Sequence, residues 1–131
     1  MTGLDTNVLV RYIMQDDPRQ SPKAARLIES LDSENPGFVT VVSVVELYWV
    51  LTSCYGLRGP DVKRALEALL RAKQIVVDRA DQVLRAVRVF DDGKADFADC
   101  LIERIASSAG CAETLTFDAA AAKHAGMSLL R

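Results

Sequence analysis

Short apolar runs alternate with longer segments of helical period along this chain, and that alternation limits the folds open to it. Phe38 to Val42 and Ile75 to Val77 have the length and β-branched content of buried strands. Between such runs, residues such as Val62, Leu66 and Leu69 recur at the spacing that places them on one face of a helix. Strands that alternate with helices in this way predict an α/β fold with a mostly parallel sheet.

The predicted fold is a three-layer α/β/α domain whose mostly parallel sheet has about four to five short strands. The chain has 131 residues, of which 50% are hydrophobic and 26% charged, so it can bury one core and is too apolar to be disordered. We therefore expect a single domain over residues 1–131. The strands are expected at residues 2–5, 38–42, 75–77, 114–117 and 128–130. The helices are expected to start near Asn7, Ser21, Ser43, Gly59, Val83, Asp96 and Asp118, with Asp92 and Gly93 ending the fifth.

Several classes of protein fit this sequence poorly. Cys54, Cys100 and Cys111 are an odd number without CxxC spacing, and His124 is the single histidine, which argues against a disulfide scaffold, a zinc site or a Cys–His catalytic pair. Buried reduced thiols are the expectation. The uncharged stretch from Leu47 to Leu57 is about half of the roughly 20 residues that a membrane helix needs. Because the N-terminus also lacks a signal-peptide pattern, we expect a cytoplasmic protein with no membrane partner.

Five acidic residues stand where predicted strands give way to predicted helices. They are Asp5, Glu46, Asp96, Asp99 and Asp118. In an open parallel sheet all strand-to-helix turns lie at the carboxyl edge, so groups distant in sequence can converge on one crevice there. The sequence therefore predicts an acidic crevice at that edge of the sheet.

Helix capping is the alternative explanation for each acid taken alone, because acids are favoured at helix N-termini. Ser43 and Glu46 have the spacing of a capping box, in which Ser43 accepts from the Glu46 amide. Asp96 and Asp99 have the same spacing, and the two remaining acids can be simple N-caps. A cap contributes about 1 kcal/mol, whereas two carboxylates about 4 Å apart repel by about 4 kcal/mol at an effective dielectric constant near 20. Converging acids therefore require a neutralising cation.

An all-oxygen ligand set suits a hard divalent cation, so Mg²⁺ is the expected cofactor and Mn²⁺ its substitute. Facing an open crevice, such an ion can lower the pKa of a water molecule, orient a phosphate and stabilise a leaving oxygen. This is the chemistry of phosphodiester hydrolysis. The sequence is compatible with one ion or with two.

Four short motifs resemble those of the PIN-domain family, in particular its prokaryotic toxins of the VapC type, and they occur in the family's order. The first is Leu4 to Leu9, the second is Val42 to Leu47, the third is Asp96 to Ile102 and the fourth is Thr116 to Asp118. The resemblance covers essentially the whole chain. It implies an α/β/α fold with a parallel sheet and a Mg²⁺-dependent endoribonuclease that uses metal-activated water.

The resemblance also implies a role for each matching acid. Three would be the principal metal-binding acids: Asp5, Glu46 and Asp99. Asp96 and Asp118 would support them by completing the cluster, binding a second ion or positioning water. All five are therefore candidate catalytic residues.

Supporting residues and partners follow from the same resemblance. Thr6, Asn7 and Ser43 would hold the carboxylates in place. The implied partners are an RNA substrate, a cognate antitoxin that lies across the active-site groove, and a second copy of the chain in a homodimer. Together these features describe the toxin of a type II toxin–antitoxin pair.

Two other functions are compatible with the acids. A housekeeping PIN nuclease of RNA processing or repair would share the chemistry. A non-catalytic, Mg²⁺-binding regulatory α/β domain of the receiver kind would need an acidic pair after its first strand and a late lysine. Here Asp5 is followed by Thr6, and no lysine is evident near Thr116.

Further side chains near the acids have more than one interpretation. Arg11, on the helix after Asp5, can contact a phosphate, an acid of the antitoxin or only solvent. Tyr48, Trp49 and Tyr55 can stack on bases, although aromatic residues on an apolar helix more often belong to a core or a dimer interface.

The net charge gains meaning from the placement of the acids. Sixteen Lys and Arg against eighteen Asp and Glu give −2, which by itself argues against a polyanionic partner. Setting aside the five candidate acids leaves thirteen against sixteen basic residues, a balance of +3 for the rest of the chain. RNA is therefore compatible with the charge, engaged through the metal and a few local cations.

Overall fold

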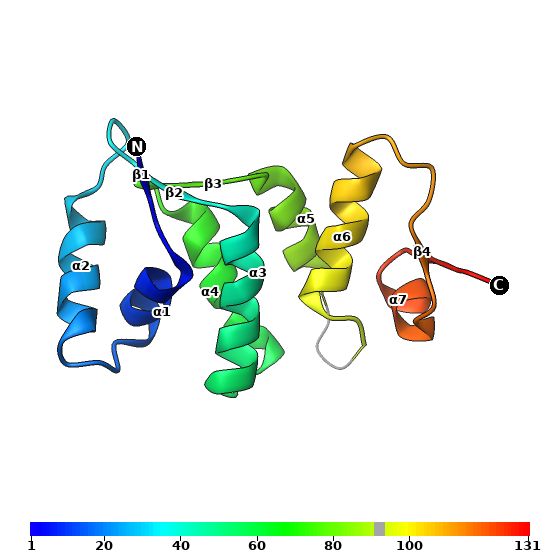
Figure 1. The fold of residues 1–131 in the computed structure, drawn as a ribbon, viewed down its shortest axis with the longest axis horizontal. Coiled ribbons are helices and arrows are strands. Elements are labelled where there is room, and N and C mark those ends of the chain that lie inside the picture. Colours follow the sequence, from blue (N-terminus) through cyan, green and yellow to red (C-terminus); the bar gives the residue numbers. More distant parts are fainter. Residues whose placement is uncertain (91–93) are drawn as a thin grey trace. The chain divides into compact units, whose positions relative to one another are not determined.

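A computed structural model of the chain describes residues 1–90 and 94–131. The contacts divide the chain into two compact units, Met1–Ala80 and Asp81–Arg131, which are described one after the other. Figure 1 follows the chain through both.

The first unit is built on a three-stranded parallel sheet in the order β1-β2-β3 (Figure 1). The strands are β1 (Thr2–Gly3), β2 (Gly37–Val39) and β3 (Ile75–Val77), and Phe38 in the central strand is in register with Gly3 and with Val76. A Cβ added to Gly37 would lie 2.6 Å from Leu4 Cδ1. A larger residue at this position of the central strand would therefore displace the side chain of Leu4, which packs against it.

Four α-helices of the first unit pack on one another and on the sheet. They are α1 (Thr6–Met14), α2 (Gln20–Ser30), α3 (Val41–Trp49) and α4 (Gly59–Arg71). Helix α1 packs against α2 and α3, and α4 packs against β3 and α3. Their fully buried side chains include Leu9, Ile28, Leu47 and Leu66, because each helix turns an apolar face inward.

Helix α3 continues into a π-helical turn, η1 (Val50–Cys54), in place of a regular last turn. The Tyr55 amide donates to the Val50 carbonyl, and Gly56 follows with a left-handed φ of 66°. Glycine adopts that conformation without steric cost, so it ends the helix here. Cys54, the last residue of the π turn, and Tyr55 after it line the same cleft as Asp5 and Glu46, which is described below.

The second unit contains α5 (Ala80–Val89), α6 (Phe97–Ser108), β4 (Leu115–Thr116), α7 (Ala119–His124) and β5 (Ser128–Leu129). Strands β4 and β5 pair in parallel, with Leu115 in register with Ser128. Phe90 and Phe97 meet edge to face with ring centroids 6.5 Å apart. This aromatic pair lies at the N-terminus of α6 and anchors the helix that carries two of the candidate acids.

The predicted α/β class is confirmed, and in the described residues all strand pairs are parallel. Hydrogen bonding sorts the strands into one sheet of three and one of two, where a single sheet was expected. The expected end of the fifth helix at Asp92 and Gly93 lies outside the described residues. The expected single domain stays a prediction. Across residues 1–90 and 94–131, no helix combines the length and apolar character needed to span a bilayer.

Candidate functional site

Thr6 holds two of the candidate acids in the first unit. Its backbone amide donates to Asp5 Oδ1 across 2.9 Å, and its hydroxyl donates to Glu46 Oε1 across 3.0 Å. Asp5 is the N-cap of α1, and Glu46 lies in the middle of α3, so the contact joins two helices that pack together. Thr6 is buried while both carboxylates are exposed, which leaves their free oxygens open to a ligand.

The two carboxylates line an open cleft of about 560 Å³, which we call the acid cleft. Besides Asp5, Glu46 and Thr6, its lining includes Arg11 from α1 and Cys54 and Tyr55 from the π turn and its end. The sequence interpretation left Arg11 and Tyr55 open between several roles. Their side chains share this cleft with the acids.

Asn7 and Ser43, two of the expected supporting residues, differ in their position relative to the acid cleft. Asn7 also lines the acid cleft. Ser43 is buried, and its hydroxyl accepts from Thr40 Oγ1 at 3.4 Å. Among the described residues, Ser43 forms no hydrogen bond with either carboxylate, whereas Thr6 does.

The expected capping box at Ser43 is wrong. Helix α3 starts two residues earlier, at Val41, and Thr40 is its N-cap, accepting from the Ser43 amide at 3.2 Å. Glu46 therefore lies too far into the helix to cap it. The reason is local. Thr40 is the last extended residue before the helix, so its hydroxyl is placed to accept from the free amide of Ser43 in the first turn.

Three further acids lie in the second unit at helix starts. Asp96 caps α6 by accepting from the Asp99 amide at 2.7 Å. Asp118 caps α7 by accepting from the amides of Ala120 and Ala121 at 2.8 and 3.4 Å. Together with Asp5, these are the caps that the sequence pattern indicates. Asp99 and Glu46 cap no helix, so capping does not account for them.

The pKa of the Asp99 carboxyl is raised by burial and by the other two acids of its unit. Partial burial raises the pKa of its carboxyl above the ordinary 3.8, and the negative charges of Asp96 and Asp118 and a hydrogen bond shared with Asp96 raise it further. A raised carboxyl pKa means that the ionised form is disfavoured in this surrounding. A cation would reverse that effect.

The donor chemistry fits a hard divalent cation. All five candidate acids offer carboxylate oxygens, which suit Mg²⁺ or Mn²⁺. Within residues 1–90 and 94–131, however, no group of three or more His, Cys, Asp or Glu side chains is close enough to hold a metal ion. Asp5 and Glu46 lie in the first unit, and Asp96, Asp99 and Asp118 lie in the second.

The chain belongs to the PIN domain family, whose sequence pattern it matches over residues 4–127. This gives it a nuclease-type fold, and PIN domains are generally metal-dependent nucleases that use divalent ions such as Mg²⁺. A comparison with curated proteins gave no significant match.

The remaining predictions for single side chains have mixed outcomes. Tyr48 is buried in the core, and Trp49 beside it is 44% exposed. All three cysteines are free, but the expectation that they are buried is correct only for Cys100, because Cys54 and Cys111 are exposed. Cys54 is the last residue of the π turn and lines the acid cleft.

Sequence reasoning missed the side chains that hold Arg11. They are Asp16, Gln20 and Tyr55, which the structure brings to its guanidinium group. Asp16 and Gln20 flank Pro18 in the chain, and no pattern in the sequence indicates that they meet Arg11.

Proposed function

We propose that this chain is a Mg²⁺-dependent endoribonuclease, the toxin of a VapC-type toxin–antitoxin pair. The observation that carries the proposal is the Thr6 linkage, which presents the carboxylates of Asp5 and Glu46 side by side on an open cleft. Membership of the PIN domain family supports the nuclease class. The motif Leu4 to Leu9 supports the toxin type through its resemblance to that group.

Asp5, Glu46 and Asp99 are the proposed principal ligands of the metal, with Asp96 and Asp118 in supporting roles. When bound, a divalent ion supplies a hydroxide-like nucleophile at neutral pH and stabilises charge on the phosphate and leaving oxygen. The chain's own residues prepare for this. Thr6 fixes the direction of the Asp5 and Glu46 oxygens, and Asp96 fixes the first turn of α6, from which Asp99 projects.

Single-stranded regions of RNA are the proposed substrate. Water would attack phosphorus and the 3′ oxygen would leave, so the products would carry 5′-phosphate and 3′-hydroxyl ends. The proposed protein partners are a cognate antitoxin and a second copy of the chain. As a toxin of this type, the protein would act on RNA in the cytoplasm.

The proposal is tested by RNA cleavage and growth inhibition with purified and expressed variants. Asp5→Asn and Asp99→Asn should abolish both activities, and removal of the metal with EDTA should abolish cleavage by the parent protein. Matched controls are Asp61→Asn on α4 and Asp81→Asn on α5, which change an exposed acid in each unit and should leave cleavage unaffected. Undiminished cleavage by pure Asp5→Asn protein would overturn the proposal.

The toxin role is separable from the nuclease chemistry. Expression of the parent protein should arrest growth, and co-expression of a small neighbouring reading frame with a DNA-binding N-terminus should restore it. RNA cleavage without growth arrest would assign the chain to RNA processing instead.

A further inference from the structure

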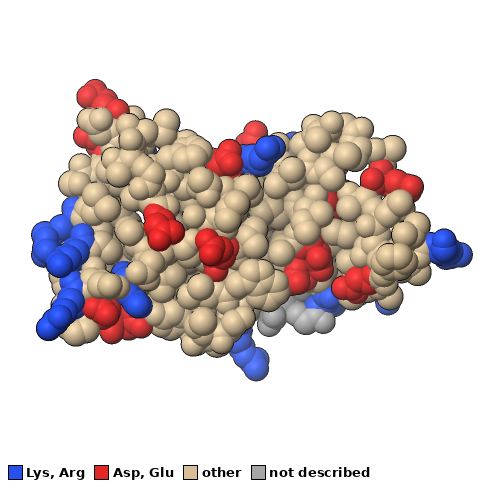
Figure 2. Space-filling view, in the orientation of Figure 1, with Lys and Arg blue, Asp and Glu red and all other residues tan. Residues whose placement is uncertain are grey.

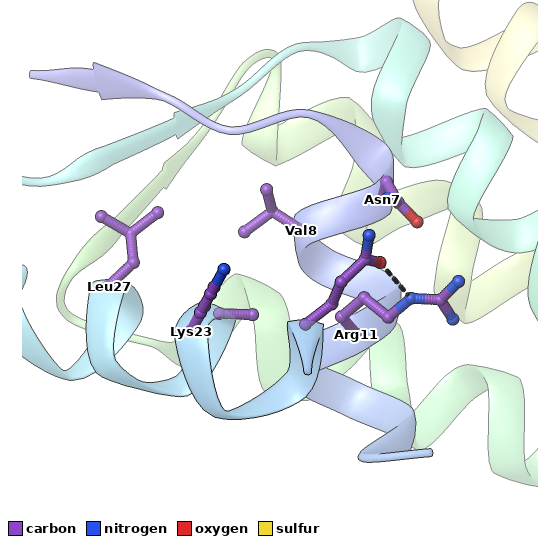
Figure 3. A pocket seen from close by; sticks show the side chains of 7 residues that line it. Asn7, Val8, Arg11, Lys23 and Leu27 are labelled. Atoms are coloured by element: carbon purple, nitrogen blue, oxygen red, sulfur yellow. Dashed lines mark hydrogen bonds between the residues drawn. The ribbon is translucent and has the colours of Figure 1, made fainter. Parts of the chain in front are cut away.

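A second cleft lies next to the acid cleft and shares two lining residues with it. This basic cleft, of about 260 Å³, lies between α1 and α2, and its lining includes Asn7, Arg11, Gln20 and Lys23, with Val8 and Leu27 (Figure 3). Asn7 and Arg11 line both clefts. They are four residues apart on α1 and therefore lie on the same face of the helix, between the two clefts.

Arg11 is held firmly at this shared wall. Its Nε donates to Gln20 Oε1 at 2.8 Å, the hydrogen bond drawn as a dashed line to Arg11 in Figure 3. Its Nη1 donates to the Tyr55 hydroxyl at 3.2 Å and to Asp16 Oδ1 at 3.4 Å. The Tyr55 hydroxyl in turn donates to Asp16 Oδ2 at 2.7 Å. Three side chains from three segments thus fix one guanidinium group, so little of its rotamer freedom remains to be lost on binding a ligand.

Part of the Arg11 guanidinium group is available to bind a ligand. Its side chain is 27% exposed, and Nη2 makes no hydrogen bond in the part of the chain that the structure describes. Gln20 engages Nε, and Asp16 and Tyr55 engage Nη1, so the N–H groups of Nη2 stay free to donate charge-assisted hydrogen bonds to phosphate oxygens.

Lys23 supplies a second cation on the α2 side of the basic cleft. It is exposed and forms no ion pair within the described residues. Figure 2 shows Lys and Arg side chains gathered over α2, the helix that carries Lys23. The apolar side chains of Val8 and Leu27 complete a wall on which a ribose or base can lie.

We propose that the basic cleft is a phosphate-binding subsite for the RNA strand, in which Arg11 and Lys23 hold backbone phosphates beside the bond that is cut. This inference rests on the proposed function, because it is the continuity through Arg11 with the acid cleft that favours a nucleic-acid strand as the occupant. The contact is to phosphate, so it is independent of base sequence. Arg11 acts here as a substrate-binding residue and Lys23 as its partner.

The test is binding of a fluorescent, mixed-sequence, single-stranded oligoribonucleotide at several salt concentrations. Asp99→Asn protein in millimolar Mg²⁺ serves as the background, since that change lies in the second unit and leaves both clefts of the first unit intact. Arg11→Gln and Lys23→Gln should each weaken binding about five- to tenfold, as loss of a charge-assisted hydrogen bond to phosphate does. The slope of log affinity against log salt should fall by about 0.7 for each lost contact.

Arg26→Gln is the matched control, because it removes the same charge from an exposed position of α2 that lines neither cleft. Its affinity should stay within about twofold of the background protein, the small effect expected of an isolated surface charge. Arg11→Lys should keep more of the salt dependence than Arg11→Gln does, but it should not keep the full affinity. A lysine carries the charge but lacks the several fixed N–H donors of the guanidinium group. Equal weakening by Arg26→Gln, or unchanged binding by both cleft variants, would overturn the subsite.

The subsite and the proposed function fail in different ways. If the parent protein cleaves RNA and the cleft variants cleave it with an unchanged KM, the subsite is wrong and the nuclease stands. If the parent protein cleaves no RNA but the cleft variants lose affinity while Arg26→Gln does not, the subsite stands and the proposed activity is wrong. Melting temperatures of all variants show whether each change leaves the fold intact.

Discussion

The hydroxyl of Thr6 donates to Glu46 Oε1 across 3.0 Å, joining residues that are forty positions apart in the chain. The amide of the same residue donates to Asp5. One buried threonine at the start of α1 therefore sets the direction of two carboxylates on different segments. This linkage is the structural basis of the acid cleft.

Replacing Thr6 with valine tests the linkage, because valine keeps the shape and removes the hydroxyl. The free energy of unfolding should fall by about 1 kcal/mol, the net contribution of one hydrogen bond. With Glu46 no longer oriented, the Mg²⁺ concentration that gives half-maximal cleavage should rise about tenfold, as happens when a supporting partner of a metal ligand is lost. Both quantities come from denaturant titration and from cleavage assays across a Mg²⁺ series.

Thr6→Ser is the control, since serine keeps the donor and should retain the Mg²⁺ dependence of the parent protein. An identical Mg²⁺ dependence for the valine and serine variants would show that Thr6 does not orient Glu46.

Asp99→Asn should stabilise the protein in EDTA at neutral pH. The folded-state pKa of Asp99 is raised, so its effect on stability is most favourable below about 3.8 and becomes unfavourable as the pH rises through the folded-state pKa. At pH 7 the unfavourable effect is complete, and asparagine removes it. The gain should be about 0.5 kcal/mol, because the carboxylate is partly exposed and screened, or about 2 °C in Tm.

Calorimetry from pH 7 downward measures this effect, and the difference between the two proteins should narrow as the pH approaches 3.8. Asp81→Asn, in the first turn of α5, is the control and should give no gain. Added Mg²⁺ should raise the Tm of the parent protein by mass action and raise that of Asp99→Asn less. A constant Tm difference at all pH values would contradict the electrostatic cause.

Local signals in the sequence were sufficient for much of this fold. Asp5, Asp96 and Asp118 each precede a segment of helical period, and each caps the helix that follows. The sequence predicts the start of α3 two residues late because Val39 to Val45 is almost entirely β-branched. Such a run favours extended structure by propensity and gives no periodic sign of where the helix begins.

The contacts that define the site have no local signal. Thr6 meets Glu46, and Arg11 meets Tyr55, only because α1 packs against α3 and the π turn brings Tyr55 back over the cleft. A π turn differs from an α-helical turn by one residue in its hydrogen bonding, which the periodicity of the sequence does not resolve. The acids were therefore predictable as candidates, and the residues that orient them were not.

The three cysteines should differ sharply in reactivity. Burial raises the pKa of the Cys100 thiol to about 11, and the charges of Asp96 and Asp99 raise it in the same direction, so almost no thiolate forms at pH 8. Cys54 and Cys111 are exposed and should react with a disulfide reagent in the folded protein, while Cys100 reacts only after unfolding. The thiolate that the reagent releases is counted before and after denaturant is added. Cys100→Ala should remove only the release that follows denaturant. Rapid reaction of all three thiols in the native protein would contradict the burial of Cys100.

Tyr55 should ionise at higher pH than a free tyrosine, because its hydroxyl donates to Asp16 and the negative charge of Asp16 opposes a phenolate. Its folded-state pKa is raised, so the contribution of this hydrogen bond is present below 10.0 and is lost as the pH rises through the raised value. The difference between the alkaline absorbance titrations of the parent protein and Tyr55→Phe isolates this one phenol. Asp16→Asn should return its midpoint toward 10.0, because the charge that opposes ionisation is gone. A midpoint that is unchanged by Asp16→Asn would show that the Asp16–Tyr55 hydrogen bond does not form in solution.

The Tyr55 hydroxyl also accepts a hydrogen bond from Arg11 Nη1. Tyr55→Phe should therefore weaken oligoribonucleotide binding about twofold, which is less than the effect of Arg11→Gln, because the guanidinium keeps its bond to Gln20.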